Sequence, residues 1–316
     1  MRAMVLIALV LTAASGVAAK PIKIEARPVP LNADDPAENV VGALIYRGGL
    51  ELTSKDPDFG GLSALGISSD GRRLVALSDR GFRFQARILY DERGRLVGLA
   101  DADLGPMGGI DGAPLTDKEF ADAESMAPGV EGEIVVAFER RHRLWRYVPG
   151  SPLPEPLPPP DELAGAPSNG GIEALALLDD GRLFALTEKY SSGEDVVGWI
   201  SDRDGWSVLT LATDGGFDPT GAATLPGGDI VVVMLRFTLA GAGRARLIRI
   251  PASQIRPGAR RRGRTIAEIG PPLTFDNFEG VEARQGARGE TLITILSDDN
   301  FNPFQRTLLM MFELKE

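Results

Sequence analysis

Residues 173–188 read EALALLDDGRLFALTE, and this short stretch decides the fold. It begins with an acidic and a small residue, continues as a hydrophobic strand, and turns at Asp180-Gly181. A second hydrophobic strand then ends on Glu188. Two short hydrophobic strands joined by a tight turn are typical of a β-hairpin.

The same pattern occurs five times along the chain. Three copies open on a glutamate and two open on a hydroxyl residue. Repeats at this scale determine the architecture before any catalytic motif is considered. The copies run from Ser63 to Asp79, Glu124 to Glu139, Glu173 to Glu188, Thr220 to Arg236 and Glu279 to Asp298.

Further strand-like runs follow most copies, for example residues 83–90 and 96–102 after the first. Units of about four strands, spaced by about 50 residues, are typical of propeller blades. The sequence therefore predicts an all-β fold, a single β-propeller of five or six four-stranded blades. The runs at residues 22–29 and 44–52 either add a strand to the last blade or contribute to a sixth.

The bulk composition fits a globular protein with an ample core, since 43% of the residues are hydrophobic and 25% are charged. The net charge of −10 makes nucleic acids and anionic membranes poor partners and favours cations. Because the chain has no cysteine, disulfides, thiolate nucleophiles and Cys-based metal sites are excluded.

The first 19 residues have the features of a secretory signal peptide. Arg2 precedes an apolar run at residues 4–11, and Val17-Ala18-Ala19 offers small residues before a predicted cut at Lys20. The apolar run is short for a membrane span, and no later stretch is long enough. We therefore expect a periplasmic or secreted domain of residues 20–316 without a transmembrane segment. An uncleaved membrane anchor is the alternative.

The repeat also predicts where the acidic residues lie. In an antiparallel hairpin the start of one strand lies beside the end of the next, so Glu124 should lie near Glu139 and Glu173 near Glu188. If the first strand of each unit is the innermost, these pairs converge on one mouth of the central channel. Clustered carboxylates need compensation, and Ca²⁺ suits them because hard cations prefer several oxygen ligands.

We predict a functional site from these acids and nearby arginines. Asp122 and Asp299 are further candidates for the same rim. The predicted metal ligands are Asp79, Glu124, Glu173, Glu188, Asp276, Glu279 and Asp298. The predicted catalytic residues are Glu124, Glu173, Glu279 and Asp298, and the predicted substrate-binding residues are Arg80, Arg140 and Arg306.

A structural interpretation of the same acids stands beside the functional one. Strand-edge Asp and Glu often accept hydrogen bonds from neighbouring backbone N–H groups. They also pair with basic residues, and Arg80, Arg140 and Lys189 directly follow three of these acids.

Other catalytic chemistries find little support. The single histidine, His142, lies among three arginines, which makes it a poor base. The chain has no Gly-x-Ser-x-Gly motif, no P-loop and no His-based metal motif. What remains is carboxylate chemistry, with or without a metal, and arginines to hold an anion.

Four motifs carry a resemblance to a known family. They are Gly60-Gly61-Leu62-Ser63, Ser78-Asp79-Arg80-Gly81, Asp276-Asn277-Phe278-Glu279-Gly280 and Leu296-Ser297-Asp298-Asp299-Asn300-Phe301. They resemble the family described as esterase-like activity of phytase, or phytase-like domain proteins, from about Gly48 to the C-terminus. The chain departs from the family's Glu-Gly pairs at Glu124-Ser125 and Glu173-Ala174, which weakens the transfer of roles to those two glutamates.

The resemblance implies an exported propeller with hydrolytic activity on phosphate or carboxylic esters. One hypothesis is therefore a calcium-assisted ester or phosphoester hydrolase that takes a small anionic ester. A second is a non-catalytic periplasmic propeller that binds a small ligand or a protein partner through the same face. A calcium-dependent lactonase is a related alternative.

Overall fold

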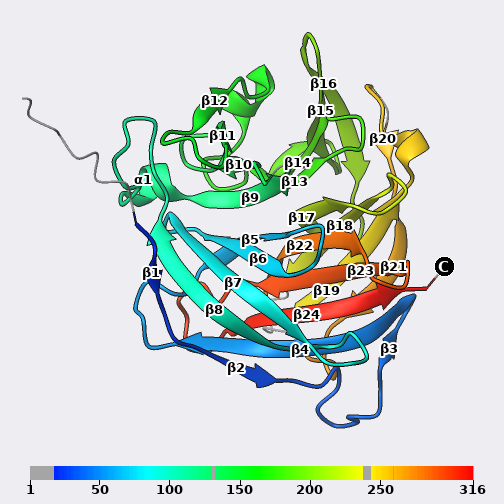
Figure 1. The fold of residues 1–316 in the computed structure, drawn as a ribbon. Helices are drawn as coiled ribbons and strands as arrows, with labels where there is room; N and C mark the ends of the chain where they lie inside the picture. Colours follow the sequence, from blue (N-terminus) through cyan, green and yellow to red (C-terminus); the bar gives the residue numbers. More distant parts are fainter. Residues whose placement is uncertain (1–17, 130–131, 238–242, 259, 316) are drawn as a thin grey trace, which may run out of the picture.

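The computed structural model describes residues 18–129, 132–237, 243–258 and 260–315, and it is built almost entirely from β-strands (Figure 1). Strands contain 56% of the residues and helices 4%, which confirms the all-β prediction. Five sheets form the blades of a β-propeller, so five blades is the correct number. The predicted signal peptide falls almost wholly on residues 1–17, outside the described residues.

Blades 1 and 2 are antiparallel sheets that follow the chain from the centre outward. In blade 1 a short N-terminal strand adds to the outer edge. Blade 1 comprises β5 (Leu62–Ile67), β6 (Arg73–Ser78), β7 (Phe82–Tyr90), β8 (Leu96–Pro106) and β1 (Lys20–Pro21). Blade 2 comprises β9 (Ala123–Pro128), β10 (Ile134–Phe138), β11 (Arg143–Tyr147) and β12 (Glu155–Leu157).

Blades 3 and 4 repeat this order, and a two-residue strand pairs in parallel with the outer strand of blade 3. Blade 3 comprises β13 (Ile172–Leu177), β14 (Leu183–Ser192), β15 (Asp195–Asp202), β16 (Gly205–Ala212) and β20 (Arg260–Arg261). Blade 4 comprises β17 (Asp218–Thr224), β18 (Ile230–Phe237), β19 (Gly243–Ile250) and β21 (Arg264–Ile269). The helical segments are α1 (Lys118–Ala121), η1 (Asp161–Gly165) and η2 (Ala252–Gln254).

Blade 5 joins the two ends of the described chain. The blue strand β4 lies beside the red strand β24 (Figure 1), and Leu50 of β4 is paired with Leu309 of β24. The N-terminal runs therefore complete the last blade rather than start a sixth. Blade 5 comprises β22 (Phe278–Gln285), β23 (Thr291–Ser297), β24 (Thr307–Leu314), β4 (Leu44–Ser54) and β2 (Ile24–Pro28), and β3 (Val40–Val41) pairs with β4.

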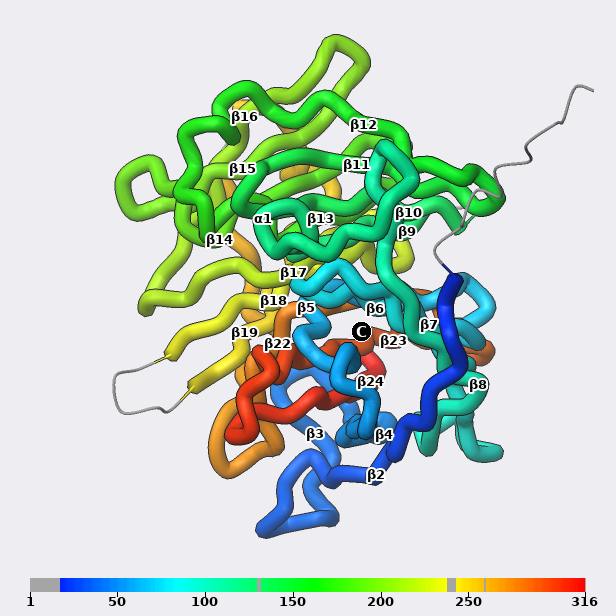
Figure 2. Tube along the Cα trace, turned by 90° about the vertical axis from the view of Figure 1, so that its left-hand side faces the viewer, coloured from blue at the N-terminus to red at the C-terminus, as the bar shows by residue number. Residues whose placement is uncertain are grey.

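The first strand of each blade packs between the first strands of its two neighbours. The contacts run from β5 to β9, β13, β17 and β22 and back to β5, so the inner strands form a closed ring. Figure 2 shows the blades following one another around this ring in chain order. Five buried hydrophobic clusters lie between successive blades, for example Phe84 with Leu296 between blades 1 and 5. The core is therefore divided among the blade interfaces.

Every inner hairpin carries a β-bulge at the same place. The register skips one residue between Leu62 and Ala64, and corresponding skips occur in the other four blades. A bulged residue is left out of the hydrogen-bonding ladder, so its side chain is free to turn elsewhere. The skipped residues are the openings of the five repeats, Ser63, Glu124, Glu173, Thr220 and Glu279.

The small residue after each opening faces the next blade. A Cβ atom on Gly280 would lie 2.8 Å from Cβ of Leu65 in blade 1. A Cβ atom on Gly221 would overlap with the backbone oxygen of Glu279 in blade 5. In blade 2 the same position is Ser125, whose hydroxyl donates a hydrogen bond to the backbone oxygen of Ile172 at 2.9 Å. The close approach of the inner strands therefore explains the small residue in the pattern.

We expect Gly221→Ala to lower the free energy of unfolding by about 1–3 kcal/mol, the usual cost of overpacking. The added methyl group meets backbone rather than a flexible side chain, so the inner strands must separate. Urea unfolding followed by circular dichroism measures the change. Gly108→Ala is the control, because a Cβ atom there meets nothing within 4 Å. Equal stability of the two variants would contradict this account of the ring.

Candidate functional site

Acidic side chains from all five blades gather in a cavity of about 370 Å³ at one mouth of the channel. The hairpin register places the opening and closing residues at the same edge, as the repeat predicts: Ala123 pairs with Phe138 and Ile172 with Thr187. Among the described residues that line this acidic mouth, nine are carboxylic acids and two are lysines. The acids are Asp79, Asp122, Glu124, Glu139, Glu173, Glu188, Asp218, Glu279 and Asp298.

Six of the seven predicted metal ligands line the acidic mouth, and Asp276 does not. The carboxylate of Asp276 instead accepts hydrogen bonds from the backbone N–H and from Nε of Arg306, both at 3.2 Å. These bonds hold the strand that follows Arg306 against the loop before β22. Asp276 therefore pairs with Arg306 and is not among the residues that line the cavity.

The predicted arginines lie outside the cavity lining, and lysines occupy it instead. The guanidinium of Arg80 stacks over the ring of Phe301, with Cζ 3.3 Å from the ring centre. Arg140 donates from Nε to Asp122. Among the described residues, the cations that line the mouth are Lys118 and Lys189, and neither is predicted from the sequence to bind an anion.

Lys118 connects two blades at the rim. Its Nζ lies 2.6 Å from Asp79 of blade 1 and 3.4 Å from Asp122 of blade 2. The residue opens α1, a short helix whose N-terminus is capped by the side chain of Asp117. Nothing in the propeller repeat predicts this insertion, so only the structure reveals Lys118 as part of the site. Lys189 directly follows Glu188, the closing acid of the third repeat, and its Nζ lies 2.5 Å from Oε2 of Glu188.

Three acids of blade 2 form the tightest group. Asp122, Glu124 and Glu139 each offer an oxygen, and these oxygens lie within 4.8 Å of one another. Only 1% of Asp122 is exposed, and its Oδ1 accepts no hydrogen bond from the described residues, although Nζ of Lys118 lies 3.4 Å away. A buried carboxylate oxygen without a donor is costly. This oxygen is suited to a cation.

Glu139 is held in place by two backbone amides. It accepts hydrogen bonds from the N–H groups of Gly170, at 2.6 Å, and Gly171. Burial raises the pKa of Glu139 to about 7, although these two N–H groups favour the ionised form. The structural interpretation of strand-edge acids therefore applies to Glu139, and Asp298 similarly accepts from the N–H of Asn300 at 2.6 Å.

The remaining acids raise one another's pKa. Burial raises the pKa of Glu124, Glu173 and Glu279 well above the usual range, and the neighbouring carboxylates add to the effect. Burial also raises the pKa of Asp298 to about 7. Several carboxylates cannot all be ionised in a small, poorly solvated volume unless a cation compensates their charge. Without a cation, some of these carboxyl groups stay protonated.

The donor set fits a hard divalent cation. The lining offers carboxylates and the side chains of Asn169, Asn277 and Asn300, all of which are oxygen donors. His142 is not part of it, since its Nε2 lies 3.0 Å from the backbone oxygen of Pro167. Oxygen-only sites favour Ca²⁺ or Mg²⁺ over zinc or copper.

The fold and the site define a class of protein, a five-bladed β-propeller with an acidic cavity at one mouth of its channel. The family comparison is consistent with this class. The family model Phytase-like, described as esterase-like activity of phytase, matches residues 57–301. The chain belongs to this family. The comparison with curated proteins gave no match.

Solved structures cover most of the chain at low identity. A protein of unknown function from Dyadobacter fermentans is 13% identical, with a TM-score of 0.44, over 95% of this chain and 100% of the other. Virginiamycin B lyase from Staphylococcus aureus is 10% identical, with a TM-score of 0.42, over 92% of this chain and 100% of the other. A luciferin-regenerating enzyme is 11% identical, with a TM-score of 0.43, over 83% and 96%.

The buried acids predict an unusual dependence of stability on pH. Glu139 and Asp298 have a pKa of about 7 when folded, far above the value of an unfolded chain. Between pH 5 and pH 7.5 the folded state therefore binds more protons than the unfolded state, and stability should fall as the pH rises. Urea unfolding in EDTA at both pH values measures this trend.

Asp298→Asn should flatten the trend, because an amide does not titrate in this range. Exposed acids such as Asp70, whose pKa is lowered by its hydrogen bonds, change protonation only below this window. A stability that rises steadily from pH 5 to pH 7.5 in EDTA would contradict the assignment of raised pKa values.

Proposed function

We propose that the protein is a hydrolase of phosphoesters or carboxylic esters, assisted by a divalent cation, with calcium the first candidate. The observation that carries this proposal is the convergence of nine acids and two lysines on one cavity. Such a cavity offers oxygen ligands for a cation and positive groups for an anionic substrate. Membership of the phytase-like family supports the choice of ester substrates.

The acids of blade 2 are the best ligands for the cation. Oxygens of Asp122, Glu124 and Glu139 already lie within 4.8 Å of one another, and Oδ1 of Asp122 accepts no hydrogen bond from the described residues. A cation bound there would polarise a phosphoryl or carbonyl oxygen and lower the pKa of a coordinated water. The fixed N–H groups on Glu139 keep that carboxylate oriented.

The acids across the cavity supply proton transfer. Glu173 and Glu279 have raised pKa values, so near neutral pH each can hold a proton for a leaving group. Asn277 donates to Oε1 of Glu279 at 2.6 Å, which orients that carboxyl group. Lys118 and Lys189, which line the cavity beside Asp79 and Glu188, would bind the anionic part of a substrate.

We also propose that the protein acts outside the cytoplasm, as residues 1–19 suggest. The first strand of the propeller, β1, begins at Lys20, the residue after the expected cut. Among residues 18–129, 132–237, 243–258 and 260–315, no helix is long and apolar enough to cross a membrane. Mass determination of the N-terminus of the exported protein tests the cleavage.

We expect calcium to raise the melting temperature of protein that has been stripped with EDTA. At 100 times the dissociation constant, binding adds about 2.7 kcal/mol of stability, or several degrees. Glu124→Gln should abolish most of this shift, whereas Glu119→Gln should keep it. Glu119 is a suitable control because it lies close by on α1 but outside the cavity lining.

A panel of aryl phosphates, aryl esters and lactones tests turnover with calcium present. Glu279→Gln should lower turnover by about 100-fold or more, the usual effect of losing a catalytic acid or base. Lys189→Met should raise KM for the phosphate but leave KM for an uncharged ester nearly unchanged, because only the former needs a positive partner.

The outcomes separate the alternatives. Turnover restricted to lactones would favour a lactonase. Calcium binding without turnover of any substrate would favour the non-catalytic binding propeller. If neither a calcium-induced shift nor any turnover is observed, the proposed function is wrong.

A further inference from the structure

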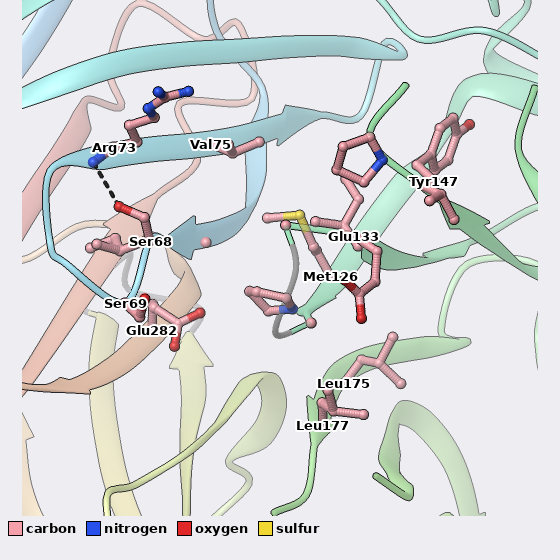
Figure 3. Close-up of a pocket in the computed structure, with 18 of the residues that line it drawn as sticks. Ser68, Ser69, Arg73, Val75, Met126, Glu133, Tyr147, Leu175, Leu177 and Glu282 are labelled. Atoms are coloured by element: carbon pink, nitrogen blue, oxygen red, sulfur yellow. Dashed lines mark hydrogen bonds between the residues drawn. The ribbon is translucent and has the colours of Figure 1, made fainter. Parts of the chain in front are cut away.

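A larger cavity lies at the opposite mouth of the channel, with a volume of about 1520 Å³. It is bounded by the turns at the far ends of the inner strands, such as Ser68-Ser69 after β5. Figure 3 shows side chains from several blades around it. None of the nine acids of the acidic mouth lines this second cavity.

The walls of the second cavity are mainly apolar. Met126, Leu175 and Leu177 come from inner strands, and Tyr147 ends β11 (Figure 3). A Pro-rich segment, residues 148–154, connects β11 to β12 and lines one side of the cavity. This segment therefore forms part of the cavity wall as well as connecting two strands.

One acidic residue of the inner ring interrupts this apolar lining. Counting from the opening of each repeat, Glu282 stands three residues after Glu279. The four equivalent positions all hold glycine or alanine, because they face the next blade at close range: Gly66, Ala127, Ala176 and Ala223. A glutamate at this position is an exception that the closed ring does not require.

The carboxyl group of Glu282 is only partly satisfied by the protein. Its Oε1 accepts a hydrogen bond from the N–H of Ala283 at 2.9 Å, and the N–H of Ile67 also donates a hydrogen bond to the carboxyl group. Its Oε2 is shielded from solvent and has no hydrogen-bond partner among the described residues. Such an oxygen calls for a donor that the described protein atoms do not supply.

Among the residues that the structure describes, no charged side chain compensates Glu282. Burial raises its pKa to about 8, and only backbone N–H groups oppose this shift. Arg73 lines the same cavity, but its side chain points away from Glu282 in Figure 3. Arg284 is engaged by Tyr90, whose hydroxyl lies 3.0 Å from its Nη2. Any cationic partner for the ionised form of Glu282 would therefore come from outside the described chain.

We propose that the second cavity binds an organic amine with an apolar body, and that the carboxyl group of Glu282 turns to accept a hydrogen bond from its ammonium group. The apolar walls bury the body of the ligand, and the negative net charge of the chain attracts its cationic head. This site is independent of ester hydrolysis at the acidic mouth.

Isothermal titration calorimetry with three probes of similar size tests the proposal at pH 7. The probes are 4-phenylbutylamine, 4-phenylbutanol and 4-phenylbutyrate. We expect the amine to bind at least about tenfold more tightly than the other two. Because the carboxyl group is largely protonated before binding, the amine should release nearly one proton, which titrations in two buffers of different ionisation enthalpy reveal.

Three variants locate the site. Glu282→Gln should weaken amine binding at least about tenfold and abolish the proton release. Asp179→Asn removes an exposed acid from the same cavity, and Glu279→Gln removes one from the acidic mouth, so both should bind the amine like the wild type. The three-probe comparison on the wild type needs no variant and so remains decisive if Glu282→Gln fails to fold.

Several outcomes would overturn the proposal. These are no amine binding by the wild type, equal amine binding by Glu282→Gln, or tighter binding of the butyrate. Loss of binding in Glu279→Gln but not in Glu282→Gln would move the amine to the acidic mouth. In each case a water molecule would be the remaining donor for Oε2 of Glu282.

Discussion

The close approach of five inner strands around the channel is the constraint on which the rest of the structure depends. It demands a small residue where each strand faces the next blade, as at Gly221 and Gly280. It also coincides with a bulge that releases the preceding residue from the ladder. The released side chain can then either hydrogen-bond to the next blade or line the acidic mouth, and both arrangements occur among the five blades.

Two blades use the released residue to hold the ring together. The hydroxyl of Ser63 donates to the backbone oxygen of Ala123 at 2.7 Å, and that of Thr220 donates to the backbone oxygen of Phe278 at 2.9 Å. A hydroxyl satisfies this bond without burying a charge. The other three blades place glutamates there, where burial and neighbouring carboxylates raise their pKa. Stability alone would favour hydroxyls at all five positions, so the glutamates point to binding or catalysis.

Local pattern made much of this predictable. The hairpins, their pairing and the shared edge of Glu124, Glu173 and Glu279 follow from a two-residue period and tight turns. The number of blades could not be predicted from local pattern. It depends on the pairing of β4 with β24, two strands that are far apart in the sequence. Lys118 was missed because α1 is an insertion between blades. The arginines were selected for their sequence proximity to acids, but long side chains at a strand end can turn away from the mouth, as Arg80 does onto Phe301.

Exceptions to a repeat are more informative than the repeat itself. A pattern that already closes the ring explains every residue that obeys it, so a costly departure needs another cause. Glu279 and Glu282 lie three residues apart on β22, yet one lines the acidic mouth and the other the apolar cavity. Both are half-buried carboxyl groups with raised pKa values, and the closed ring requires neither, since two blades use Ser or Thr at the first place and four use Gly or Ala at the second. Glu282 is the departure from the repeat, whereas Glu279 shares its place with Glu124 and Glu173, and because both lie on β22 the two sites can be separated by single substitutions on one strand.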